Sequence, residues 1–235
     1  MTEHEARVAL IEGCRSLNTL GINQGTSGNV SIRYGEIMLI SPSAIPYDLL
    51  EPEMIAAMPI TGEYGAWSGD LPPSSEWRVH LDILRSRFDV GAVVHSHPTF
   101  CTAFAIARKE IPAVHYMMAA FGGPTVRCAP YATFGTVELS AHALRALKGR
   151  NACLLANHGM IVCAATLSKA MWLAVELETL ARQYWHSLLI GHPAILTKAE
   201  FAEAARAFGK YGLRDETTVP DLRQTGTQDP DDPAT

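Results

Sequence analysis

The chain has 235 residues, of which 48% are hydrophobic and 18% are charged, and its formal net charge is -5. This length and composition are typical of one globular domain with a full hydrophobic core, and they exclude an intrinsically disordered chain. The negative charge argues against nucleic acid and against an anionic membrane surface as partners.

The cysteines and the N-terminus bear on where the protein works. The five cysteines are odd in number and form no C-x-x-C motif, so they indicate neither a disulfide framework nor a zinc–thiolate site. The N-terminal segment is charged and lacks the apolar core of a signal peptide, and no apolar stretch reaches the length of a membrane span. We therefore expect a soluble cytoplasmic protein.

The first sixty residues are predicted to form one helix and three strands. Apolar residues recur at helical spacing over residues 3–20, and Gly21 ends that helix. A loop dense in small residues follows. Three short apolar runs separated by turn residues then indicate strands over residues 30–33, 37–40 and 54–60.

The middle of the chain alternates between helices and strands. A helix is predicted to begin at Ser75, with an apolar stripe that faces the core and consists of Trp77, Leu81, Leu84 and Phe88. Glu76 lies near the start of this helix and off the stripe. The elements expected next are strand 91–95, helix 99–107, strand 125–128, helix 136–147 and a hairpin of strands 152–156 and 160–163.

Two more helices are predicted near the C-terminus, over residues 167–189 and 198–209. In the longer one, Glu178 and Arg182 are four residues apart, and we expect them to form an ion pair on the flank of the helix.

These elements predict a single domain of the α/β (α+β) class over residues 1–213, with a mainly antiparallel central β-sheet flanked by helices. After Leu213 the chain turns polar and acidic. Residues 214–235 cannot bury enough apolar surface to order themselves, so we expect a disordered tail.

Three histidines and a glutamate form the candidate metal site. His95 and His97 end a β-branched strand, on which residues i and i+2 point to the same side. His158 ends another apolar strand, and Glu76 adds a carboxylate. Three neutral imidazoles leave a coordination position open, which is typical of a catalytic metal ion.

Other interpretations of the histidines stay open at this point. A histidine is more often a surface or satisfied core residue than a metal ligand. Glu76 and His80 are four residues apart on one helix face, and they form an alternative metal-binding pair. His80 itself, like His142, His186 and His192, lies in a helical or post-helical context and is otherwise expected to be structural or to face solvent.

Three small-residue loops are candidates for phosphate binding, namely residues 25–29, 41–44 and 74–75. Each offers hydroxyl and backbone N–H groups with little side-chain bulk. The pair Ser74-Ser75 also lies at a predicted helix start, where the helix dipole and unpaired N–H groups favour an anion. Any one loop could be an ordinary turn or cap, but all three beside a candidate metal centre favour a phosphate site.

Together these motifs resemble the class II aldolase/adducin family. The resemblance spans residues 6–213 and rests on Gly-Thr-Ser-Gly-Asn at 25–29, Ser-Pro-Ser-Ala-Ile-Pro-Tyr at 41–47, Pro-Ser-Ser-Glu at 73–76, His-Ser-His at 95–97, Ile-Pro-Ala-Val-His-Tyr-Met at 111–117, Cys-Ala-Pro-Tyr-Ala-Thr-Phe-Gly at 128–135, Asn-His-Gly at 157–159 and Lys-Tyr-Gly-Leu-Arg at 210–214. The combination is specific for the family and is most similar to its fuculose-phosphate branch.

The resemblance implies a zinc ion, for which Mn²⁺ or Co²⁺ could substitute, held by His95, His97 and His158. Glu76 would be a labile fourth ligand and the catalytic base. The phosphate would be bound by residues of the three loops, namely Thr26, Ser27, Gly28, Asn29, Ser43, Ala44, Ser74 and Ser75.

The resemblance also implies a cyclic homotetramer with active sites between subunits. Tyr116 would reach in from a neighbouring subunit and donate a proton to the aldehyde oxygen. Three aromatic residues would line the aldehyde end, namely Phe134, Phe208 and Tyr211.

The implied reaction is the reversible cleavage of a ketose 1-phosphate, of the L-fuculose 1-phosphate type, into dihydroxyacetone phosphate and an aldehyde such as lactaldehyde. One alternative is an aldolase for 5-deoxyribulose or 5-methylthioribulose 1-phosphate. Others are a sugar-phosphate 4-epimerase, in which Asp typically replaces Glu76, and a decarboxylase of sugar-acid phosphates. A non-catalytic adducin-like domain is disfavoured by the intact histidines and Glu76.

Two departures from the family pattern bear on the substrate. The phosphate loop has Ser43-Ala44 where Thr-Gly is expected, and Phe121 stands where a small residue is usual. We expect Phe121 to reshape the wall near Tyr116.

Overall fold

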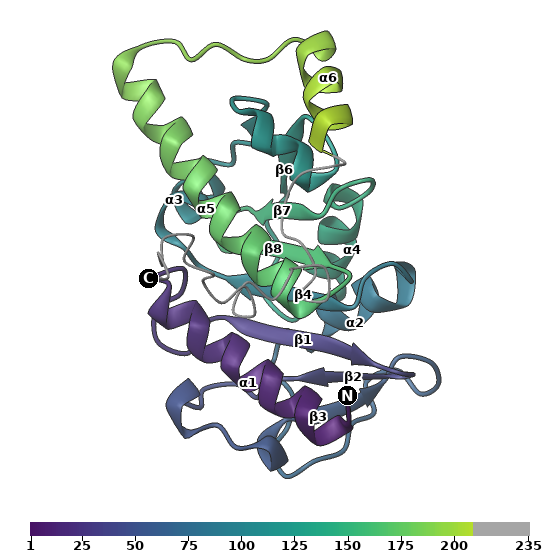
Figure 1. Ribbon diagram of the computed structural model, residues 1–235. Helices are drawn as coiled ribbons and strands as arrows, with labels where there is room; N and C mark the ends of the chain where they lie inside the picture. The colour runs from purple at the N-terminus through teal and green to yellow at the C-terminus, as the bar shows by residue number, and fades with distance from the viewer. Residues whose placement is uncertain (209–235) are drawn as a thin grey trace, which may run out of the picture.

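A computed structural model describes residues 1–208 of the chain (Figure 1). Tyr211, the motif at 210–214 and the predicted tail over 214–235 lie outside the described residues.

The core of the fold is one eight-stranded sheet (Figure 1). Its strands, in the order β3-β2-β1-β4-β8-β7-β6-β5, are β3 Ala56–Pro59, β2 Ile37–Ile40, β1 Asn29–Tyr34, β4 Ala92–Ser96, β8 Gly159–Ala164, β7 Ala152–Leu155, β6 Thr125–Ala129 and β5 Ile111–Pro112. All neighbouring strands are antiparallel except β6 and β7, which pair in parallel. The predicted α/β class with a mainly antiparallel sheet is confirmed, and the sheet is mixed because a helix connects β6 to β7.

Helices cover both faces of the sheet. They are α1 Glu3–Thr19, α2 Trp77–Ser86, α3 Thr99–Ile106, α4 Val137–Ala146, α5 Leu167–Ile190 and α6 Lys198–Phe208. All six were predicted to within a few residues. Three 3-10 helices were not predicted, namely η1 Tyr47–Leu49, η2 Pro52–Met54 and η3 Tyr116–Phe121.

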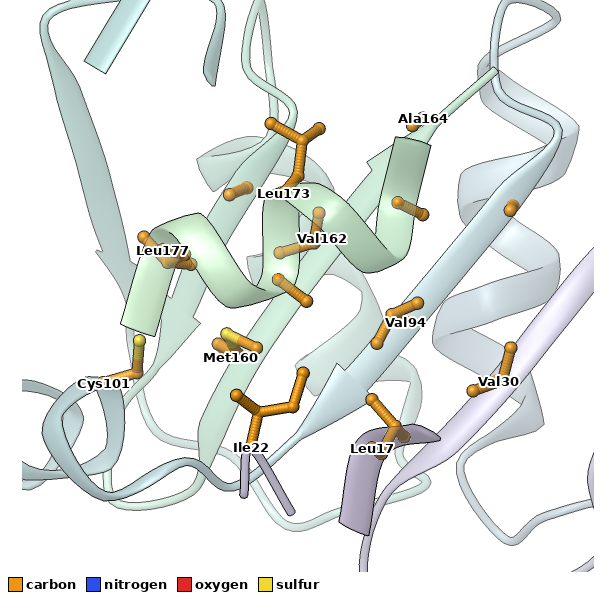
Figure 2. Close-up of a cluster of buried hydrophobic side chains, with 14 of the residues drawn as sticks. Leu17, Ile22, Val30, Val94, Cys101, Met160, Val162, Ala164, Leu173 and Leu177 are labelled. Atoms are coloured by element: carbon orange, nitrogen blue, oxygen red, sulfur yellow. The ribbon is translucent and has the colours of Figure 1, made fainter. Parts of the chain in front are cut away.

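Successive residues of a strand point to opposite faces of the sheet and therefore pack in two separate apolar layers. Val94 packs with α1, α3 and α5 on one face, whereas Val93 packs with α2 and α4 on the other. Figure 2 shows the first layer, in which Leu173 and Leu177 of α5 lie over Val162 of β8. Both layers hold β4 and β8 rigidly, and these strands carry or flank the candidate metal ligands.

The predicted core position of Phe88 is wrong. Leu81 and Leu84 are fully buried, but Phe88 is 87% exposed, because α2 ends at Ser86. The Arg33 side chain donates to the backbone carbonyls of Leu84, Val90 and Arg87, and this holds the chain in a turn beyond the helix. Phe88 therefore lies outside the helical stripe.

The predicted ion pair between Glu178 and Arg182 is also wrong. Glu178 is buried, and its two carboxylate oxygens accept hydrogen bonds from the backbone N–H groups of Phe100 and Cys101 at 2.8 and 2.9 Å. Pro98 at the start of α3 provides no capping side chain, so Glu178 of α5 binds the unpaired N–H groups instead.

The five cysteines are free thiols, and all except Cys128 are buried. No helix among residues 1–208 has both the length and the hydrophobicity that a membrane span requires.

Candidate active site

The three histidines predicted as metal ligands converge at one end of the sheet. β4 carries His95 and leads into His97, and the turn between β7 and β8 carries His158. One ring nitrogen from each of the three lies within 4.8 Å of the others. The Nε2 atoms of His95 and His97 are 2.9 Å apart. Among residues 1–208, this is the group of side chains that could hold a metal ion.

The turn that carries His158 is shaped by its two neighbours. Asn157 has a φ of 55°, a left-handed conformation that Asn tolerates better than most residues. At Gly159, an added Cβ atom would lie 2.5 Å from the His97 ring and 2.5 Å from the carbonyl oxygen of Ser96. Glycine at 159 therefore allows the two metal histidines to approach each other.

Hydrogen bonds and burial prepare the rings to act as ligands. The Nδ1 atom of His95 lies 2.8 Å from the carbonyl oxygen of Met160, so it carries the proton there and Nε2 faces the cluster. Burial lowers the pKa of His97 to about 4, with His95 and His158 acting in the same direction. Burial and the neighbouring His95 lower the pKa of His158 to about 4. His97 and His158 are therefore neutral near pH 7, as metal binding requires. The pKa of His95 is raised instead, because Glu76 and the Met160 carbonyl outweigh its burial.

Glu76 completes the cluster from the N-terminal end of α2. Its Oε2 atom is 3.0 Å from His95 Nε2, and its Oε1 atom is 3.3 Å from His158 Nε2. Burial alone would raise the pKa of Glu76, but His95, His158 and a hydrogen bond from Asn29 outweigh it and hold this pKa well below its usual range. Oε1 is buried without a hydrogen-bond partner. An orphaned carboxylate oxygen facing convergent imidazoles fits a divalent cation.

A cavity of about 360 Å³ opens beside this cluster and gathers the three candidate phosphate loops. Its walls are Thr26, Ser27, Gly28, Asn29, Pro42, Ser43, Ala44, Ser74, Ser75, Glu76, His97, Phe134 and His158. No lysine or arginine is among them, so the polar groups of this cavity are hydroxyls, amides, backbone and the metal cluster itself.

Two of the loops are bound to each other. The Ser43 hydroxyl accepts a hydrogen bond of 2.9 Å from the backbone N–H of Ser75. The backbone N–H of Ser74 donates to the Ser41 carbonyl at 3.0 Å. Ser43 and Ser75 are exposed at the cavity, where their hydroxyls can reach a ligand.

His80 is not a metal ligand, so the alternative pairing of Glu76 with His80 is wrong. Its ring is fully buried, with Nδ1 at 2.7 Å from Ser31 Oγ and Nε2 at 2.6 Å from Asn29 Oδ1. Both ring nitrogens are thus engaged. This network was not predicted from the sequence, because Ser31 and Asn29 are 49 and 51 residues away from His80 along the chain.

Two further candidate residues lie apart from the Glu76 cavity. Tyr116 and Phe208 line a second cavity, of about 500 Å³, between η3 and α6. Tyr116 is 48% exposed. Phe134 is 61% exposed and lines the first cavity. Phe121, the last residue of η3, is fully buried and lines neither of these two cavities.

Comparison with known proteins gives consistent matches over most of the chain. Residues 8–185 match the family described as the class II aldolase and adducin N-terminal domain. A 5-methylthioribulose-1-phosphate/5-deoxyribulose-1-phosphate aldolase of Rhodospirillum rubrum is 50% identical over 206 residues, which cover 88% of this chain and 92% of the relative. An L-fuculose phosphate aldolase of Escherichia coli K12 is 49% identical over 208 residues, covering 88% and 95%.

A solved structure of L-fuculose 1-phosphate aldolase matches the fold as well. It superposes with a TM-score of 0.84 at 36% identity, and the match covers 89% of this chain and 98% of that structure.

Proposed function

Since this chain belongs to the class II aldolase and adducin family, we propose that it is a zinc-dependent aldolase. The proposed reaction is the reversible cleavage of a ketose 1-phosphate of the L-fuculose 1-phosphate type into dihydroxyacetone phosphate and an aldehyde such as lactaldehyde. The single observation that carries this proposal is the shared cavity. One 360 Å³ space is bordered both by the His97, His158 and Glu76 cluster and by the small-residue loops.

The donor set supports a catalytic rather than a structural metal ion. His95, His97 and His158 would hold the ion, and Glu76 would be a labile fourth ligand. Three imidazoles with a displaceable fourth donor are typical of catalytic zinc sites. Zinc bound there would act as a Lewis acid for the negative charge that develops on the oxygen atoms of the three-carbon fragment.

The loops are proposed to hold the phosphate and so fix the substrate in the cavity. Ser43, Ser74 and Ser75 offer hydroxyl and N–H donors, as does the loop that contains Thr26, Ser27, Gly28 and Asn29. Holding the phosphate end converts random encounters into a fixed geometry, which is a large share of the rate gain in many enzymes.

Glu76 is the proposed base. During cleavage the bond between C3 and C4 breaks, and C3 receives a proton from the Glu76 carboxyl; in the synthetic direction the same carboxylate removes that proton. Its burial and its orphaned Oε1 atom support this role, since a proton-transferring group must be held close to the reacting carbon.

Tyr116 is proposed to exchange the proton of the C4 oxygen, which becomes the aldehyde oxygen. Within one chain Tyr116 borders a different cavity from Glu76. This separation supports sites that are shared between subunits. In the proposed homotetramer, Tyr116, Phe208 and Tyr211 of one subunit complete the site of the next, while Phe134 belongs to the subunit that holds the metal.

The reaction is tested by the release of dihydroxyacetone phosphate from three compounds, namely fuculose 1-phosphate, 5-deoxyribulose 1-phosphate and 5-methylthioribulose 1-phosphate. We expect release by the zinc-loaded protein that chelation abolishes and zinc restores. No release from any of the three would contradict the proposal and would favour an epimerase or a decarboxylase.

The second candidate substrate class is the 5-deoxyribulose and 5-methylthioribulose 1-phosphates. It is favoured by the Rhodospirillum rubrum relative, which is as similar to this chain as the fuculose phosphate aldolase is. The ranking of kcat/KM among the three compounds decides between the two classes.

The role of Glu76 has its own test. Glu76→Gln keeps the size of the side chain but removes the ionisable proton site. We expect the variant to retain the metal ion and to lose at least about 100-fold in proton exchange at C3 of dihydroxyacetone phosphate. Exchange is measured by deuterium incorporation from D₂O, and wild-type incorporation would remove Glu76 from the role of base.

We also propose a cytoplasmic location. It is supported by the free state of all five cysteines, which fits a reducing compartment.

A further inference from the structure

A chain of hydrogen bonds runs behind Glu76, between β1 and α2. Ser31 and Asn29 lie two residues apart on β1 and project to the same side, and His80 lies one turn after Glu76 on α2. The contacts are Ser31 Oγ to His80 Nδ1 at 2.7 Å, His80 Nε2 to Asn29 Oδ1 at 2.6 Å and Asn29 Nδ2 to Glu76 Oε2 at 3.1 Å. All four side chains are buried.

The direction of every bond in this chain follows from the carboxylate. An ionised carboxylate only accepts, so Asn29 must turn its NH₂ group to Glu76 and its oxygen to His80. His80 must then donate from Nε2. A neutral ring has only one N–H group, so Nδ1 accepts from the Ser31 hydroxyl.

We propose that His80 is a positioning residue, which acts through Asn29 to fix the orientation of the Glu76 carboxylate. Asn29 holds Oε2 at 3.1 Å, while Oε1 is left without a hydrogen-bond partner and faces the histidine cluster. Oε2 also lies 3.0 Å from His95 Nε2, so both oxygens face the cluster, and Oε1 is the one without a hydrogen bond, open to a cation or to a substrate proton. The inference rests on the proposed role of Glu76 as ligand and base.

The network also links Glu76 to the candidate phosphate loop. Asn29 is a wall residue of the cavity as well as the partner of Glu76 and His80. An amide nitrogen carries two N–H groups, and Glu76 uses one of them. The hydrogen bond between the Asn29 oxygen and His80 fixes the plane of the Asn29 amide, and therefore the direction of both of its N–H groups.

Two matched substitutions separate positioning from mere space filling. The amide nitrogen of Gln can replace the Nε2 atom of histidine, whereas the shorter Asn reaches only the place of Nδ1. His80→Gln therefore keeps a donor for Asn29, and His80→Asn loses it. Both variants introduce a neutral amide at the same buried position.

Kinetics and metal spectroscopy serve as independent readouts. For His80→Asn we expect kcat for ketose phosphate cleavage to fall roughly 10–100-fold with little change in KM, as for other residues that orient a metal ligand. In the Co²⁺-substituted protein, we expect the visible absorption spectrum of His80→Asn to shift toward that of Glu76→Gln. His80→Gln should retain most of the wild-type kcat and the wild-type spectrum.

Thermal unfolding of each variant provides the folding control. If His80→Asn does not fold, Ser31→Ala replaces it, because that change removes only the hydroxyl that fixes the ring tautomer. We then expect a smaller fall in kcat and a spectral shift in the same direction.

Three results would overturn the inference. The first is a folded His80→Asn variant with wild-type kcat and spectrum. The second is an equal loss of kcat in both His80 variants that follows their loss of stability. The third, where His80→Asn does not fold, is a Ser31→Ala variant with unchanged kcat and spectrum. Absence of turnover by the wild-type protein, together with the expected spectral shifts, would instead refute the aldolase proposal and leave the positioning role intact.

Discussion

Gly159 is the residue on which the close approach of the metal histidines depends. A methyl group there would meet the His97 ring and a backbone carbonyl, both at 2.5 Å. The carbonyl belongs to β4 and cannot rotate away, so the His97 ring must move. We predict that Gly159→Ala weakens Zn²⁺ or Co²⁺ binding roughly 10–100-fold, as does other damage to ligand orientation.

The affinity is measured by competition with a chromophoric chelator. Gly13→Ala is the control, because an added methyl there meets only the flexible end of the Leu167 side chain at 3.3 Å. Wild-type metal affinity in Gly159→Ala would show that the cluster tolerates displacement of His97.

Ala44 carries backbone strain in the candidate phosphate loop. Its φ is 63°, in the left-handed region, which costs an L-residue with a Cβ about 1–2 kcal/mol. This is the position where the sequence departs from the expected glycine. We predict that Ala44→Gly stabilises the protein by about 0.5–1 kcal/mol, the relief of strain exceeding the added entropy of the unfolded chain. Urea unfolding measures this difference, and a lower midpoint would contradict it.

Residues joined by local spacing were predictable, and residues joined only by tertiary contact were not. His95 and His97 were predicted to act together because residues i and i+2 of a strand project to the same side of it. His80 could not be placed, because its partners Ser31 and Asn29 are 49 and 51 residues away. Its helical spacing to Glu76 suggested that the two side chains bind one metal ion. Instead, they are connected by hydrogen bonds through Asn29.

At the scale of elements, Glu178 of α5 caps the N-terminus of α3. Glu178 accepts from two backbone N–H groups that the helix itself leaves unpaired. α3 begins directly after His97 and Pro98, so this bond also anchors the segment that carries a metal ligand. We predict that Glu178→Ala destabilises the protein by about 2–3 kcal/mol, since charge-assisted bonds are lost and buried donors are left unpaired.

Urea unfolding measures this loss as well. The control is Glu176→Ala on the same helix, which removes an equal charge from a less buried position. Equal effects of the two substitutions would mean that net charge, rather than capping of α3, explains the result.

Elements with a clear apolar period or flanking turn residues were predictable, including the four-residue strand β2, whereas the 3-10 helices were not. The six helices and the hairpin around His158 followed from apolar spacing. η3 did not, because the six apolar residues from Tyr116 to Phe121 fit a strand or a helix equally well. The parallel pairing of β6 and β7 was implicit in the helix predicted between them, since parallel neighbours require such a crossover.

At the scale of the whole molecule, the candidate catalytic groups fall into two cavities. Glu76, His97 and His158 border one, and Tyr116 and Phe208 border the other. The sequence indicated both sets of residues, but no pattern within one chain shows whether the two sets in one active site come from the same subunit. Whether Tyr116 serves its own subunit or a neighbour is a property of the assembly, and it can be tested with two inactive variants.

We predict that Glu76→Gln and Tyr116→Phe chains, each nearly inactive alone, regain activity when they are unfolded and reassembled together. In a randomly mixed ring, a site works only if its own chain keeps Glu76 and its neighbour keeps Tyr116, so about a quarter of the sites are intact. Mixing Glu76→Gln chains with the Glu76→Gln, Tyr116→Phe double variant is the control, because no site can then be complete. If both groups served the same subunit, every site in the first mixture would lack one of them, and its activity would stay at the level of the separate variants.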